Sequence, residues 1–197
     1  MLIFFKERLA LLSVPKTGST AYFKSLRDRA NIVVSGPPDL KHAPVRRFDR
    51  FFQNIFLKMY DTELEVMAVV REPLDWLGSW YRYRSRPELL GHEKATHDVT
   101  FDAFVQGYLR TPRPPFADVG SQSEFFRTRS NGRGATHVFR YDNQQAILDF
   151  LQDRLDTEIN LTRENVSPKR SMDIAPQTER RFRKIHAAEF DLYDRAR

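Results

Sequence analysis

The sequence predicts an α/β fold, a three-layer α/β/α arrangement in which a central, mainly parallel sheet lies between helices. Short apolar runs typical of buried strands alternate with segments whose apolar residues recur at helical spacing. Two of the apolar runs lead directly through turn residues into a helix, as strands of parallel sheets do. At 197 residues the chain is expected to form one domain, residues 1–197.

The apolar pattern places each expected element. Strands are expected over residues 2–5, 9–14, 31–34, 64–70 and 136–141, with Lys6–Arg8 at a bend between the first two. Helices are expected over residues 19–30, 43–60, 73–84, 101–109, 121–129, 142–155 and 179–193. Asp142 with Gln145 resembles a capping box at the start of one of these helices.

The segment from Pro15 to Thr20, called here the Pro15–Thr20 loop, has the composition of an anion-binding turn. It follows the apolar run 9–14 and opens a helix, whose unpaired backbone N–H groups attract phosphate. Gly18 allows close approach of the backbone, Lys16 adds a cation, and Ser19 and Thr20 add hydroxyl groups. The loop is therefore predicted to bind a phosphate-like group.

This loop differs from the nucleoside-triphosphate motif G-x-x-x-x-G-K-[ST], because Lys16 precedes the loop's single glycine. Proteins with that motif also hold magnesium through a strand that ends in Asp, whereas the run 64–70 ends in Arg71. The sequence favours a site that binds phosphates through cations and hydroxyls, and no metal site is expected.

A second phosphate-binding segment begins at Arg71. Pro73 suits the first turn of a helix, and Leu77, Trp80 and Tyr81 share one helical face. Arg71 would end a strand and offer its planar guanidinium to phosphate oxygens, while Ser79 would add a hydroxyl two turns into the helix.

Together the two segments resemble the sulfotransferase family that uses 3′-phosphoadenosine-5′-phosphosulfate (PAPS), in particular its carbohydrate-type members. The family has a P-K-x-G-[ST]-[ST] loop and an R-x-P-x5-S arrangement, matched here by residues 15–20 and 71–79. The resemblance covers residues 9–30 and 64–84 and continues weakly through 138–142, 150–151 and 165–168. It implies a fold like that of the phosphate-loop nucleotide hydrolases.

The resemblance also implies roles for individual residues. The loop residues Lys16, Thr17, Gly18, Ser19 and Thr20 would hold the 5′-phosphosulfate. Arg71 and Ser79 would hold the 3′-phosphate, which the product adenosine 3′,5′-bisphosphate retains.

Sulfuryl transfer needs a cation at the leaving oxygen and a base for the acceptor hydroxyl. Lys16 is placed at the leaving or bridging oxygen. Since the family's base is a His or Glu that follows the first strand–helix unit, His42 is the expected base, with Asp39 next. A loop histidine without chemistry is the alternative for His42.

The acceptor is expected to be a hydroxyl-bearing molecule, with a carbohydrate such as an anionic glycan favoured, while lipid, peptide tyrosine and small-molecule acceptors stay open. The net charge of +6 favours an anionic ligand, although a basic surface is often simply solvated. The basic residues that could form a rim for it are Lys41, Arg46, Arg47, Arg50, Arg82, Arg84 and Arg86. Trp76, Trp80 and Tyr81 fit either base stacking or the core, and Gly132–Gly134 fits either nucleotide closure or a plain turn. Residues 165–170 fit either a ligand contact or a plain connecting loop.

The chain has no cysteine, so disulfide and thiolate chemistry are excluded. No apolar window reaches membrane length, and the chain is expected to be cytoplasmic, without a membrane span or a nucleic-acid partner. The sequence leaves the oligomeric state open. Two other functions also remain open: a phosphate-loop-like nucleotide kinase, and a non-catalytic protein that binds polyanions or nucleotides.

Overall fold

The computed structural model describes residues 1–161 and 168–197. By its internal contacts the chain divides into two compact units. Unit 1 comprises Met1–Arg71, Gln122–Glu164 and Arg195–Arg197, and unit 2 comprises Glu72–Ser121 and Asn165–Asp194. The single domain predicted from the sequence stays a prediction. Residues 165–167 of the predicted late loop lie outside the described residues.

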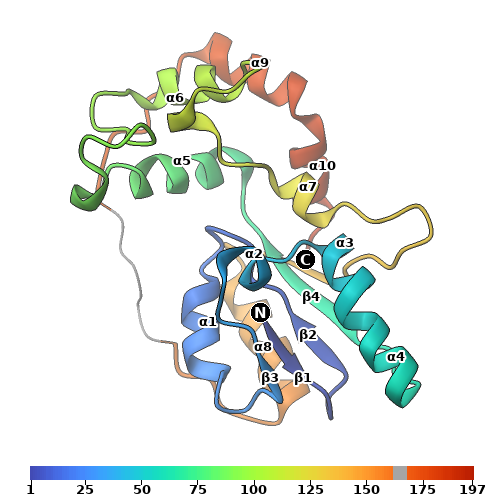
Figure 1. The fold of residues 1–197 in the computed structure, drawn as a ribbon. Helices are drawn as coiled ribbons and strands as arrows, with labels where there is room; N and C mark the ends of the chain where they lie inside the picture. Colours follow the sequence, from blue (N-terminus) through green and yellow to red (C-terminus); the bar gives the residue numbers. More distant parts are fainter. Residues whose placement is uncertain (162–167) are drawn as a thin grey trace. The chain divides into compact units, whose positions relative to one another are not determined.

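Unit 1 contains one five-stranded sheet with the strand order β3-β1-β2-β4-β5 (Figure 1). The strands are β1 Leu2–Phe4, β2 Leu9–Leu11, β3 Ile32–Val33, β4 Glu65–Val70 and β5 His137–Arg140. The α/β class predicted from the sequence is confirmed, and every expected strand is present, each of them shorter than expected.

The sheet is mixed, which corrects the expectation of a mainly parallel one. β2 pairs parallel with β4, and β4 pairs parallel with β5, while β1 pairs antiparallel with both β2 and β3. The reason lies in the connection between the first two strands. Only residues 5–8 join them, with the Arg8 amide donating to the Phe5 carbonyl at 3.1 Å, and a parallel pair needs a much longer crossover.

Helices of unit 1 connect these strands. They are α1 Ser19–Leu26, α2 Pro38–Lys41, α3 Val45–Arg47, a π-helical segment Phe48–Gln53, α4 Asn54–Tyr60, α7 Gln122–Phe126 and α8 Gln144–Leu155. The helix predicted to start at Asp142 is capped instead by Asn143, whose side chain accepts from the Ala146 amide at 3.3 Å. The predicted capping box at Asp142 is therefore wrong by one residue.

Unit 2 is helical in its described part. It contains α5 Pro73–Tyr83, α6 Phe101–Tyr108, α9 Pro176–Ile185 and α10 Ala187–Asp194, with short 3₁₀ turns at Pro87–Leu89 and Pro115–Ala117. The last predicted helix, 179–193, begins earlier, at Pro176, because proline suits the first helical turn. It is also divided at His186, whose φ of −109° and ψ of 36° depart from helical values.

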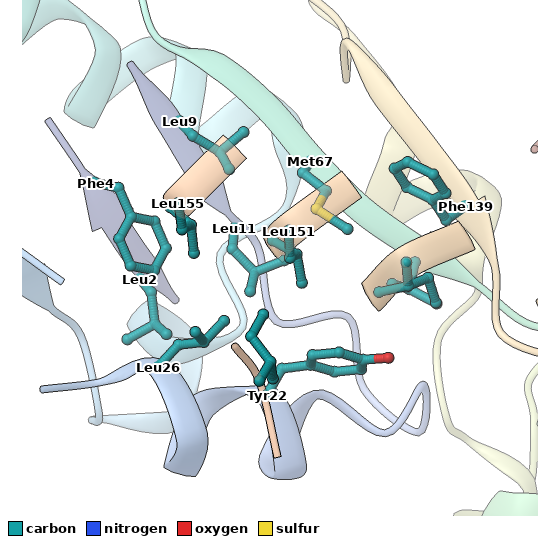
Figure 2. Packing of buried hydrophobic residues seen from close by; sticks show 13 residues of the cluster. Leu2, Phe4, Leu9, Leu11, Tyr22, Leu26, Met67, Phe139, Leu151 and Leu155 are labelled. Carbon is teal, nitrogen blue, oxygen red and sulfur yellow. The ribbon is translucent and has the colours of Figure 1, made fainter. Parts of the chain in front are cut away.

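Alternate residues of the strands enter two different apolar clusters, one on each face of the sheet. In the first, Tyr22 and Leu26 of α1 and Leu151 and Leu155 of α8 pack against side chains such as Met67 (Figure 2). The second joins the other strand residues to the helices at 45–60 and to α7. The period of two along each strand explains this division.

An ionic group lies at the starting ends of β4 and β5. Glu65 accepts from His137 Nε2 at 2.6 Å and from Arg154 Nη2 at 3.0 Å, and Arg154 Nε also donates to the Glu7 carbonyl at 2.9 Å. The hydrogen bond from His137 is the main cause that lowers the pKa of the Glu65 carboxyl below its ordinary 4.5. The group thus joins two neighbouring strands to α8.

We expect Glu65→Gln to lower the free energy of unfolding near neutral pH, by a modest amount because the carboxyl is partly exposed to solvent. A carboxyl with a lowered pKa in the folded state adds stability above its unfolded pKa, and this stability is lost as the pH falls through the folded value. The difference between the wild type and Glu65→Gln should therefore shrink below about pH 4.5. Urea unfolding at a series of pH values measures it, and a constant difference would contradict the account.

Candidate functional site

The Pro15–Thr20 loop leaves β2 and turns sharply into α1. The Leu12 amide still donates to the Met67 carbonyl of β4 at 2.9 Å, so the chain remains in the sheet until just before the turn. Lys16 and Gly18 then have φ values of 68° and 71°, the left-handed region. Glycine adopts this conformation readily, whereas for lysine it costs about 1–2 kcal/mol, so the surrounding contacts must hold Lys16 in place.

Hydroxyl groups of the loop close the turn. Thr17 Oγ1 donates to the Val14 carbonyl at 3.0 Å, and Ser19 Oγ lies 3.4 Å from the same oxygen. Thr17 is buried, while Gly18 is exposed and Ser19 and Thr20 are half-buried. The hydroxyl proton of Thr17 is therefore used within the loop, where it fixes the turn.

Arg71, directly after β4, is held at both its backbone and its side chain. The Gln122 amide accepts from the Arg71 N–H and donates to the Arg71 carbonyl, both at 2.8 Å. The guanidinium Nη1 donates to the Lys16 carbonyl at 3.1 Å, and its carbon lies 4.4 Å from the centre of the Tyr141 ring. The structure thus brings Arg71 to the Pro15–Thr20 loop, although the two are 55 residues apart in sequence.

Tyr141 also packs against the loop itself. A Cβ built on Gly18 would lie 2.9 Å from the ring carbon Cε2 of Tyr141, closer than ordinary contact. Gln144 donates to the Tyr141 carbonyl and accepts from the Tyr22 hydroxyl of α1 at 2.7 Å. Tyr141 and Gln122 therefore support the candidate site, a role that neither residue type nor sequence position predicted for them.

His42 lies beside the end of the strand that leads into the loop. Its Nδ1 is 2.7 Å from the Ser13 carbonyl, so Nδ1 carries the proton and donates it. The neutral ring then has its lone pair on Nε2, the form that a general base needs. Burial is the main cause that lowers the pKa of His42 below its ordinary 6.5, opposed by the Ser13 hydrogen bond and reinforced by Lys41. The other base considered, Asp39, lies on α2 and is exposed.

Ser79 belongs to unit 2, in the middle of α5, and is 7% exposed. The helix begins as predicted: Pro73 is at its start, and the Glu72 carboxylate accepts from the Asp75 amide at 2.8 Å. Next to Ser79, a Cβ on Gly78 would lie 1.9 Å from the Met172 methyl, so Gly78 permits the close approach of that side chain. The joint role predicted for Arg71 and Ser79 stays a prediction.

Several other candidates have structural roles in their own units. Trp76 and Tyr81 are buried in the apolar cluster of unit 2, which favours the core alternative for them. Arg84, considered for a basic rim, is 7% exposed and donates to the Pro115 and Asp118 carbonyls, both at 2.6 Å. Arg133 of the Gly132–Gly134 turn bonds Glu63 at 2.7 Å, as a plain turn residue does.

A narrow hollow in unit 1 adjoins the loop. It is lined by Leu2, Leu11, Leu12, Ser13, Thr17, Ser19, Tyr22, Phe23 and Val69. The lining is mainly apolar, with hydroxyl groups where it meets the loop. In the part of the chain that the structure describes, no three His, Asp or Glu side chains gather to hold a metal, and no helix is long and apolar enough to cross a membrane.

No protein-family model, curated protein or solved structure matches the chain. The residues of the candidate site place a lysine, a strained turn, a helix start, an arginine and a histidine around the end of β2, all within unit 1. Such a set can bind an anion and accept a proton.

We expect Gly18→Ala to lower the free energy of unfolding by about 1–3 kcal/mol, because alanine must adopt a positive φ and its Cβ must displace the Tyr141 ring. The matched control is Gly134→Ala, whose Cβ would meet its nearest neighbour at an ordinary 3.4 Å. That change should cost less than about 0.5 kcal/mol. Chemical unfolding measures both, and equal losses would refute the assignment of strain to Gly18.

We expect His42 to titrate below the ordinary 6.5 and to carry its proton on Nδ1 when neutral. Because a lowered pKa keeps the ring neutral at lower pH, the neutral form should dominate at pH 6.5. Lys41→Ala should raise the pKa of His42 by removing one of the charges that lower it. Nitrogen-15 NMR, with the signal assigned through His42→Gln, measures both properties, and an unperturbed pKa or the Nε2–H tautomer would count against this geometry.

Proposed function

We propose that this protein is a sulfotransferase that moves the sulfuryl group of PAPS to a hydroxyl of an acceptor. The observation that carries the proposal is the hydrogen bond from Arg71 to the Lys16 carbonyl. It joins the two segments that are expected, from the resemblance, to bind opposite phosphate ends of a single nucleotide. The parallel pairing of β2 with β4 supports it further, because both segments follow the carboxyl ends of these strands.

In the proposed transfer, His42 acts on the acceptor and Lys16 on the donor. The donor carries its sulfuryl group on a phosphate oxygen. In the proposed reaction the acceptor oxygen bonds to sulfur as the bond from sulfur to that phosphate oxygen breaks. Nε2 of His42 takes the hydroxyl proton, and the Lys16 ammonium stabilises the negative charge left on the phosphate.

The remaining parts of the proposal rest on the resemblance. Within it, Thr17, Gly18, Ser19 and Thr20 bind the 5′ end of the donor and Arg71 binds the 3′-phosphate, while the role of Ser79, which lies in unit 2, stays a prediction. The fold is proposed to be the three-layer, phosphate-loop-like one, supported by the apolar clusters on both faces of the sheet. A carbohydrate acceptor and a cytoplasmic location stay predictions.

We expect adenosine 3′,5′-bisphosphate to bind without metal, as measured by isothermal titration calorimetry. Lys16→Ala and Arg71→Ala should each weaken binding about 10- to 100-fold, since each removes a charge-assisted contact to a phosphate. His42→Ala is the matched control, because a base for the acceptor does not hold the nucleotide. It should bind as tightly as the wild type and lose transfer to an acceptor.

Two outcomes would overturn the proposal. If the bisphosphate fails to bind while ATP with magnesium binds, the kinase alternative takes its place. If the bisphosphate binds equally well to the wild type and to Arg71→Ala, the nucleotide does not use this site. Full transfer activity in His42→Ala would contradict only the assignment of His42 as the base and would leave the rest of the proposal standing.

A further inference from the structure

One helical stretch of unit 1, residues 45–60, carries an exposed apolar stripe. Phe51, Ile55 and Met59 follow one another at a spacing of four residues, which places them on one face of a helix. Their exposed fractions are 55%, 49% and 68%. Tyr60, at the end of α4, is also exposed, at 56%. We call Phe51, Ile55 and Met59 the apolar stripe.

A row of cations lies beside the apolar stripe. Arg47, Arg50 and Lys58 belong to the same helical stretch, Arg50 and Lys58 exposed and Arg47 half-buried. The Arg50 guanidinium carbon lies 5.1 Å from the centre of the Phe51 ring. Arg47 donates to the backbone carbonyl of Asp39 at 2.8 Å. Within the described residues, no ion pair neutralises any of these three cations.

The opposite face of this stretch is packed into the protein. Phe48 and Phe56 are buried in the second apolar cluster of the sheet, and Phe52 packs against it. The Tyr60 ring lies 5.1 Å from that of Phe5, at the end of β1. Because the buried face anchors the helix, the apolar stripe and its cations are displayed in a fixed orientation.

We propose that the face formed by the apolar stripe with Arg47, Arg50 and Lys58 docks onto an anionic lipid surface. A helix that lies in a membrane interface combines these two features, apolar side chains that enter the acyl boundary and cations beside the headgroups. A second copy of the chain is disfavoured as the occupant, because it would bring like-charged rows close together. The inference does not depend on the proposed enzymatic function.

The test is co-sedimentation of the intact chain with lipid vesicles. Vesicles of phosphatidylglycerol and phosphatidylcholine in equal parts should bind it, more weakly at high salt, and pure phosphatidylcholine should bind it far less. Phe51→Ser/Met59→Ser and Arg50→Gln/Lys58→Gln should each weaken binding about tenfold or more. All four side chains are exposed or half-exposed and lie outside the core, so these variants are expected to fold.

Matched controls come from exposed residues of unit 2. Leu90→Ser removes a side chain that is 73% exposed, and Lys94→Gln/Arg110→Gln removes two exposed cations. Neither should change binding. The proposal fails if anionic vesicles do not bind the chain, or if the controls weaken binding as much as the stripe variants. It also fails if sedimentation equilibrium finds a dimer that the stripe variants dissociate, since the face would then be occupied by a second copy.

Discussion

The Arg71 guanidinium donates to the Lys16 carbonyl at 3.1 Å and so ties the end of β4 to the turn between β2 and α1. The arrangement of the candidate site depends on this contact. Lys16 has left-handed backbone angles, which are unfavourable for any residue with a Cβ. The hydrogen bond from Arg71 fixes the direction of the Lys16 carbonyl. The Gln122 side chain hydrogen-bonds the backbone of Arg71, and the Tyr141 ring packs against its guanidinium. The loop and the arginine thus support each other.

The features of the fold that repeat over short distances could be predicted from the sequence. The apolar runs located every strand of the sheet, and the helical pattern located most helices, because burial imposes a period of two or of 3.6 residues. The ends were less predictable. At Asn143 and His186, the start and the break of a helix depend on backbone angles and on a single capping hydrogen bond. The antiparallel pairing of β1 with β2 follows from the short connection at residues 5–8, which the apolar pattern marked only as a bend.

Only part of the candidate site could be predicted from the sequence. Pro15–Thr20 and Arg71 could, because their residue types are unusual directly after apolar strands. Gln122 and Tyr141 do not, since their importance lies in contacts with residues more than 50 positions away. The residue types also did not reveal that the Thr17 hydroxyl donates within the loop. His42 could be predicted only through the resemblance, while its hydrogen bond to Ser13 gives the orientation that a base requires.

The central claim is that one nucleotide with phosphates at both ends binds where Arg71 meets the Pro15–Thr20 loop. A crystal structure of the protein with adenosine 3′,5′-bisphosphate tests this most directly. The account predicts the 5′-phosphate at the backbone N–H groups of the loop, beside the Lys16 ammonium, and the 3′-phosphate in contact with the Arg71 guanidinium. A bisphosphate bound elsewhere, with the loop and Arg71 free of phosphate, would contradict it.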